Sequence, residues 1–163
     1  MGICLPMTIR TYRPADAASV TDIYRRAVER IGSRYYEARQ VRAWAALAPS
    51  PERLDALTSD GRVRLVAVDE ADRPLAFADL EARGRIHFLY CAPEAAGTGV
   101  ASALYEALER AAGERGIDRL WAEASEAARP FFLAKGFALA GRRDFEVAGV
   151  PIHNYAMEKS LAG

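Results

Sequence analysis

The spacing of apolar residues divides the chain into helix-like and strand-like stretches. Where helices are expected, apolar side chains recur every third or fourth position and so share one helix face. Short apolar or alternating runs bounded by Gly, Pro or Asp indicate strands. The predicted helices are residues 17–31, 35–48, 50–57, 100–111 and 126–135, and the predicted strands are residues 8–12, 63–68, 75–81, 86–91, 119–123, 137–147 and 152–158.

Residues with known capping roles mark several helix ends. Asp16 is expected to cap the first helix at its N-terminus, and Gly32 to end it. Ser50 and Pro51 suit the N-cap and the first position of the third helix. Pro130 falls early in the fifth helix and is expected to interrupt it.

The order of these elements predicts an α+β fold in one domain. Hairpins dominate the first half, and a single parallel crossover follows. We expect a mixed, largely antiparallel central sheet of about seven strands flanked by helices. Residues 1–7 are predicted to be an N-terminal extension and residues 8–163 the domain, since 163 residues suffice for one sizeable core.

Residues 89–108 combine a strand, a stop, a glycine turn and a helix. Pro93 ends the strand because proline has no amide hydrogen to donate. Gly97 and Gly99 permit a tight turn and a close approach to a ligand. The free amides at the start of the following helix suit a phosphate or pyrophosphate. A tight connection without a ligand is the structural alternative.

The glycine turn does not fit the common nucleotide motifs. The chain has no Gly-x-x-x-x-Gly-Lys-Ser/Thr, and Ser102 stands where Gly-x-Gly-x-x-Gly needs its third glycine. The turn also comes more than halfway along the chain, whereas a dinucleotide fingerprint opens its βαβ unit. A nucleotide-binding domain is therefore a disfavoured alternative.

Composition and charge narrow the function classes further. Apolar residues make up 51% of the chain and charged residues 27%, and 22 basic side chains balance 22 acidic ones. This balance favours neither nucleic acid nor a membrane surface as a partner. The Cys and His residues lie too far apart for a metal site, and Cys4 and Cys91 are not expected to form a disulfide. Without a signal peptide or an apolar 18-residue run, the predicted location is cytoplasmic.

The glycine turn resembles the cofactor loop of the GNAT superfamily of acyl-CoA-dependent N-acetyltransferases. That loop reads Gln/Arg-x-x-Gly-x-Gly/Ala, and this chain matches it at Gly99 and Ala101 but has Ala96 at the first position. The resemblance implies acetyl-CoA as cosubstrate, with its pyrophosphate on the backbone amides of residues 95–101 and its thioester beside residues 89–91. The implied cofactor-binding residues are Leu89, Tyr90, Cys91, Ala95, Ala96, Gly97, Thr98, Gly99, Val100, Ala101, Ser125 and Phe132.

A second stretch, residues 125–137, is similar to the family pattern Asn-x-x-Ala-x-x-Leu-Tyr-x-x-x-Gly-Phe. Ala128, Gly136 and Phe137 match it outright. Ser125 replaces an Asn that often contacts the pantetheine arm in the family. Phe132 replaces a Tyr that often protonates the departing thiolate, so that role does not carry over. A core helix is the structural explanation of the same stretch.

Acetyl transfer to an amine needs a base, because amines are mostly protonated at pH 7. His87 is the first candidate, since an unperturbed histidine pKa of about 6.5 suits the task. Glu123 is the second candidate, and Asp79 and Glu81 are the third. Tyr155 is the candidate acid because the last strands approach the active site in the family. Each of these residues also has an ordinary structural explanation.

The expected reaction is direct attack of an amine on acetyl-CoA, with Cys91 as a disfavoured covalent nucleophile. The acceptor is expected to be a small-molecule or peptide amine. Substrate contacts are expected from Tyr35, Tyr36, Arg39 and Trp44. The alternative is a catalytically inactive, acyl-CoA-sensing or partner-binding domain with the same fold. Because family members are often dimers, a homodimer is left open.

Overall fold

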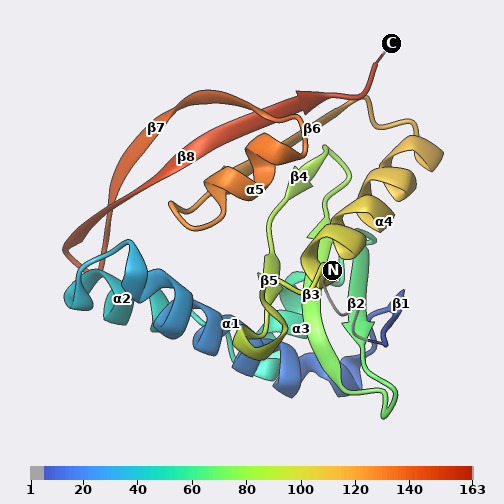
Figure 1. Ribbon diagram of the computed structural model, residues 1–163, viewed down its shortest axis with the longest axis horizontal. Helices are drawn as coiled ribbons and strands as arrows, with labels where there is room; N and C mark the ends of the chain where they lie inside the picture. The colour runs from blue at the N-terminus through green and yellow to red at the C-terminus, as the bar shows by residue number, and fades with distance from the viewer. Residues whose placement is uncertain (1–5, 163) are drawn as a thin grey trace.

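The computed structural model describes residues 6–162 (Figure 1). The helices and strands, with three short 3-10 turns, follow one another in this order: β1 (Thr8–Thr11), η1 (Pro14–Asp16), α1 (Ala17–Ile31), η2 (Gly32–Arg34), α2 (Ala38–Ala45), α3 (Pro51–Leu57), β2 (Val63–Val68), β3 (Pro74–Leu80), β4 (Arg85–Ile86), β5 (Leu89–Cys91), η3 (Pro93–Ala95), α4 (Val100–Glu114), β6 (Arg119–Ala124), α5 (Arg129–Ala134), β7 (Ala138–Val147) and β8 (Val150–Ser160).

Several helix ends follow local sequence as expected, and two do not. The hydroxyl of Ser50 accepts a hydrogen bond from the Arg53 amide at 3.2 Å and caps α3. Asp16 does not cap α1, because its carboxylate instead accepts a hydrogen bond at 2.8 Å from the amide of Arg13, the residue before η1. Pro130 does not interrupt α5 but lies in its first turn, where the missing amide hydrogen has no cost.

The strand predicted over residues 86–91 is broken into two. β4 pairs in parallel with β6, whereas β5 pairs antiparallel with β3, so the run passes from one sheet to another. The amides of His87 and Phe88, which lie at the break, donate to Oδ1 of Asp79 at 2.9 and 2.7 Å. A carboxylate thus replaces the ladder partners that the break removes.

The strands form two four-stranded sheets, in the orders β1-β2-β3-β5 and β4-β6-β8-β7. In Figure 1 they diverge from the point where β4 gives way to β5, and the long β7–β8 hairpin sweeps away from β3 and β2. Within residues 6–162, counting the broken run as one strand gives the seven strands expected. Most pairings are antiparallel, as predicted, and β4 with β6 is the parallel exception.

Two hydrophobic clusters hold the layers together. One contains Leu104 and Leu108 of α4 and Met157 of β8. The other contains Val20 and Val28 of α1 and packs against the first sheet and the hairpin. Helices therefore cover both sides of the sheets, and the break between β4 and β5 lies between the two clusters.

The N-terminal extension predicted over residues 1–7 lies mostly outside the described residues, as does Cys4. Met7 packs against the first cluster, and Cys91 is a free cysteine. Among the described helices, none combines the length and apolar character needed to cross a membrane.

Candidate functional site

Two cavities open beside the broken strand and meet there. The larger, about 390 Å³, lies against the glycine turn and is called here the glycine-loop cavity. The other, about 280 Å³, is lined by Arg85 and Arg143 and is called the arginine cavity. Both are lined by Trp44, Leu89, Tyr90, Ser125 and Ala128. A ligand in one cavity can therefore meet a ligand in the other beside β5.

The glycine turn forms one wall of the glycine-loop cavity. Gly97 and Gly99 have φ of +76° and +88°, a backbone conformation that other residues rarely adopt. Gly99 is the N-cap of α4, so the free amides of the first turn of that helix lie at this wall. The end of α1 also lines this cavity, and Nη1 of Arg26 in α1 donates to Oε2 of Glu94 at 2.8 Å. This ion pair ties the loop to α1.

The free edge of β5 also faces the junction of the cavities. β5 is the outermost strand of its sheet. The Asp79 amide donates to the Phe88 carbonyl, and the Ala92 amide donates to the Leu75 carbonyl. The backbone groups of residues 88 and 92 therefore point towards β3. In an antiparallel ladder every second residue points its backbone groups to the partner strand, and the residues between them point theirs away. The backbone groups of Leu89 and Cys91 are therefore unpaired within this sheet and available to a ligand.

Most of the predicted cofactor residues line the glycine-loop cavity: Leu89, Tyr90, Cys91, Ala95, Ala96, Gly97, Gly99, Ala101 and Ser125. Three do not. Thr98 bonds the Ala95 carbonyl with its hydroxyl, and Val100 is buried in the core. Phe132 lines the arginine cavity instead, because it faces inward from α5 and packs on Phe137.

Four polar side chains of the arginine cavity share one face of the second sheet. Arg85 pairs with Trp121, two residues before Glu123, and Arg143 pairs with Asn154. Alternate residues of a strand point to the same face, and cross-strand partners share it. Arg143 Nη1 donates to Oε2 of Glu123 at 2.8 Å and to Oδ1 of Asn154 at 2.9 Å. Arg85 Nη2 lies 3.6 Å from the same carboxylate oxygen.

His87 lines the arginine cavity from the break itself. Its ring stacks on Phe88, with 4.2 Å between the ring centroids. Burial, reinforced by the positive charges of Arg85 and Arg62, lowers the pKa of His87 to about 4. The imidazole is therefore neutral at pH 7 and accepts a proton only weakly.

The third pair of candidate bases lies away from both cavities. Asp79 is fully buried, and its Oδ2 pairs with Arg62 at 2.8 Å. Burial raises the pKa of Asp79 to about 6, despite its hydrogen bonds. Glu81 lines neither cavity and lies 3.7 Å from both Arg62 and Arg85. Both carboxylates belong to the ion-pair network behind the break.

Tyr155 lies on the opposite face of the second sheet from Glu123. It pairs with Ala124 and Arg142, whereas Glu123 pairs with Ala156. Its hydroxyl donates to Oε1 of Glu126 at 2.5 Å, and that carboxylate raises the pKa of Tyr155. Tyr155 lines neither cavity.

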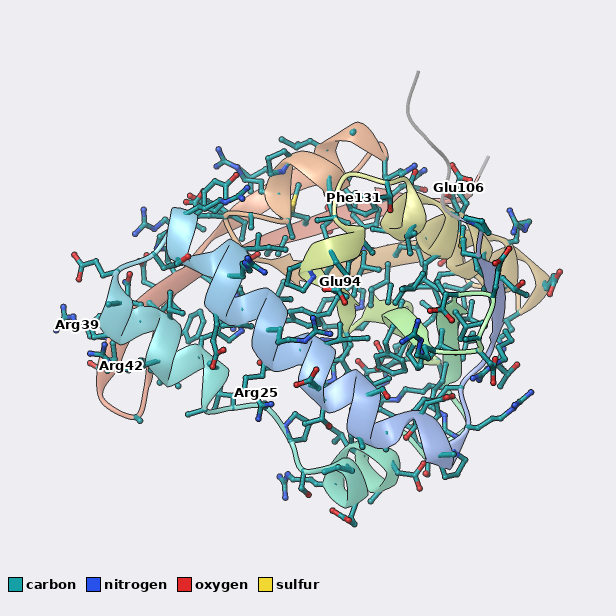
Figure 2. The ribbon with its side chains drawn as sticks, turned by 60° about the horizontal axis from the view of Figure 1, so that its bottom comes forward. Arg25, Arg39, Arg42, Glu94, Glu106 and Phe131 are labelled. Atoms are coloured by element: carbon teal, nitrogen blue, oxygen red, sulfur yellow. The ribbon has the colours of Figure 1, made fainter. Side chains whose placement is uncertain are left out.

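Of the four residues expected to contact the substrate, two line the arginine cavity and two do not. Tyr36 and Trp44 line the arginine cavity, with 5.5 Å between their ring centroids. Tyr35 is exposed, and Arg39 projects outward from α2 beside Arg42 (Figure 2). The α2 helix is tied to the β7–β8 hairpin, since Gln40 donates to the Pro151 carbonyl at 3.0 Å. These contacts close one side of the arginine cavity.

Residues 33–159 match the model of the acetyltransferase (GNAT) domain. The chain belongs to the GNAT family of N-acetyltransferases. It is 30% identical over 149 residues to the uncharacterized N-acetyltransferase YafP of Escherichia coli, covering 91% of this chain and 93% of that protein.

Solved GNAT structures share the fold. A GCN5-related N-acetyltransferase from Rhodopseudomonas palustris is 32% identical, with a TM-score of 0.89 over 98% of both chains. A phosphinothricin acetyltransferase of Sinorhizobium meliloti, solved with AcCoA, is 26% identical, with a TM-score of 0.74 over 97% of this chain and 90% of that one. The fold predicted from the sequence is confirmed.

The three residues at which this GNAT chain departs from the family motifs lie in different surroundings. Ala96 is exposed and lines the glycine-loop cavity without a charge. The hydroxyl of Ser125 accepts from the Ala128 amide at 3.1 Å and caps the turn before α5. Phe132 is a buried wall residue with no proton to give.

Four polar side chains that line the arginine cavity were not singled out from the sequence: Tyr24, Arg85, Arg143 and Asn154. The alternation of Arg143 with Phe145 and Val147 was a usable signal, because it places all three on one face of a strand. Which face meets the cavity depends on the partner strand, and no local pattern reports that.

Proposed function

We propose that this chain transfers an acetyl group from acetyl-CoA to the amine of a small molecule. The glycine-loop cavity binds acetyl-CoA and the arginine cavity binds the acceptor. The observation that carries the proposal is the junction of the two cavities at Leu89, Tyr90 and Ser125. A thioester and an amine held in the two cavities come together beside the free edge of β5.

The residues of the glycine-loop cavity suit the donor. The amides at the start of α4 favour a pyrophosphate, and Gly97 and Gly99 let the backbone approach it. The unpaired backbone groups of Leu89 and Cys91 can hydrogen-bond an extended amide chain, such as the pantetheine arm of the donor. Amide hydrogens along this edge also suit the oxyanion that forms at the thioester carbon.

In the proposed reaction the amine nitrogen attacks the thioester carbon. The C–N bond forms, the C–S bond breaks, and the CoA sulfur leaves with the electron pair. Glu123 receives the proton of the amine, because its carboxylate lines the cavity proposed for the acceptor. His87 supplies a neutral wall, because its lowered pKa makes it a weak base.

The leaving thiolate needs little assistance. Thiols have pKa values of about 8.5, so a thiolate leaves without full protonation. Tyr90 is a phenol that lines both cavities, and burial raises its pKa well above the usual range. Tyr90 keeps its proton and donates a hydrogen bond to the developing thiolate, in place of the family tyrosine that Phe132 replaces. Burial also raises the pKa of Cys91 to about 11, which disfavours a covalent route through that thiol.

Release of CoA thiol from acetyl-CoA, followed against a panel of primary amines, tests this proposal. We expect amine-dependent thiol release well above the rate without amine. The second candidate function, an acyl-CoA sensor, is favoured by the loss of the phenol at Phe132. A sensor binds acetyl-CoA but releases no thiol with any amine, and this result would replace the enzyme proposal.

A further inference from the structure

The arginine cavity carries an excess of positive charge among its lining residues. Among the described residues, Arg85 and Arg143 line it, and Glu123 is the one acidic residue that does so. The neutral imidazole of His87 adds no charge at pH 7. A ligand that carries only a positive charge leaves this excess uncompensated.

The guanidinium of Arg85 is incompletely paired. Its Nε is buried and has no hydrogen-bond partner among the described residues. Its other nitrogens approach Glu81 and Glu123 only at 3.7 and 3.6 Å, beyond hydrogen-bonding distance. Nη1 and Nη2 therefore keep free donors, and a planar guanidinium with free donors is suited to a carboxylate, which it can bind through two parallel hydrogen bonds.

Glu123 is arranged to serve the other end of the same ligand. The hydrogen bond from Arg143 reaches Oε2, and the closest approach of Arg85 is to that oxygen as well. The other oxygen, Oε1, accepts no hydrogen bond from a described residue. It is therefore open to an ammonium group while the two arginines meet an anion.

The size and walls of the cavity define the rest of the ligand. At about 280 Å³ it suits a small molecule, and α2 and the hairpin close one side of it. Tyr24, Trp44 and Phe145 provide an aromatic wall. We infer that the acceptor is a small amine that also carries a carboxylate, with an apolar or aromatic body, and that Arg85 and Arg143 bind the carboxylate. The inference rests on the proposed function.

Matched pairs of acceptors test the inference, each an amino acid and the amine left by its decarboxylation. Suitable pairs are phenylalanine with phenethylamine and leucine with isoamylamine. For the amino acid that is the better acceptor, we expect kcat/KM to be at least tenfold higher than for its decarboxylated amine. Hydrogen bonds to charged groups contribute about 10- to 100-fold. Arg85→Gln and Arg143→Gln should each reduce that ratio by about tenfold.

Arg142→Gln is the matched control. Arg142 neighbours Arg143 on β7 but points to the other face and bonds Asp144 at 3.0 Å. It should leave the ratio unchanged. If both arginine variants misfold, the ratio of kcat/KM for the amino acid to kcat/KM for the amine, measured on the unmodified chain, still tests the inference.

The outcomes separate the inference from the proposed function. If acetyl-CoA fails to bind, the proposed function is wrong, and the inference that rests on it is wrong as well. If acetyl-CoA binds, the acids are also titrated calorimetrically into the protein loaded with CoA. Acids that neither bind nor react better than the decarboxylated amines would overturn the inference and leave the proposed function standing.

Discussion

Oδ1 of Asp79 accepts a hydrogen bond from the backbone amide of His87, at 2.9 Å, where the chain passes from one sheet to the other. The same oxygen accepts from the Phe88 amide, and Oδ2 pairs with Arg62. These contacts stabilise the break between β4 and β5, beside which the two cavities meet. The candidate site therefore depends on one buried carboxylate that does not line it.

Replacing Asp79 tests this structural role. Asp79→Asn keeps an acceptor for the two amides but places an amide group against Arg62, whose side chain is only 5% exposed. We expect the free energy of unfolding to fall by about 2–4 kcal/mol, the cost typical of breaking a buried ion pair. Asp60→Asn is the control, since Asp60 bonds the same arginine from an exposed position. It should cost less than about 1 kcal/mol. Equal losses in urea unfolding would contradict the role given to Asp79.

The choice of base predicts unequal effects at Glu123 and His87. Glu123→Gln should lower kcat/KM for the amine by about 100-fold or more, the usual contribution of a general base. His87→Gln should lower it by less than about tenfold and leave the pH profile unchanged above pH 5. A larger loss in the His87 variant, with a changed pH profile, would make His87 the base instead.

His87 also predicts a pH dependence of stability. Its pKa is about 4 in the folded chain against 6.5 for the free side chain, so the unfolded state binds the proton more tightly. The stability contributed by neutral His87 is present above pH 6.5 and is lost as the pH falls towards 4. His87→Gln should therefore gain stability relative to the unmodified chain over this interval. Parallel stability curves, measured by urea unfolding at each pH, would contradict the lowered pKa.

The donor site predicts a position-specific effect on α4. Ala101 lines the glycine-loop cavity in the first turn of the helix, whereas Ala103 lines neither cavity. Ala101→Glu places a negative charge where the proposed pyrophosphate binds and should raise KM for acetyl-CoA by about tenfold or more. Ala103→Glu adds the same charge to the same helix and should change KM less than about threefold. Similar KM values in the two variants would place the donor elsewhere.

The departure at Ala96 predicts a gain of affinity. Ala96 is exposed and lines the glycine-loop cavity, so an arginine there would add a positive charge beside the proposed pyrophosphate site. Ala96→Arg should tighten acetyl-CoA binding by about three- to tenfold, and the gain should shrink as salt is added. Calorimetric titrations at two salt concentrations check both parts. An unchanged Kd at low salt would mean that the loop does not face the phosphates.

Local sequence patterns determine much of this fold. The helix predicted over residues 17–31 has those bounds in the structure, because a continuous apolar stripe and its burial agree. The strand predicted over residues 63–68 is likewise observed, and its hairpin partner ends one residue early. The glycine turn was recognisable because Gly97 and Gly99 need a positive φ.

What the sequence could not supply depends on distant contacts. The apolar run at residues 86–91 has no internal sign of a break, since the break is stabilised by Asp79 and Arg62 from elsewhere in the chain. Arg143 and Asn154 resemble solvent-facing residues of a hairpin until their register with Glu123 is known. Tyr155 could not be assigned to a face for the same reason.

Calorimetric titration with acetyl-CoA tests most directly whether the glycine-loop cavity is the donor site. We expect one acetyl-CoA to bind per chain, with weakened binding in Ala101→Glu and no comparable binding of ATP or NAD. Absence of acetyl-CoA binding, or equal binding by Ala101→Glu and the unmodified chain, would contradict it.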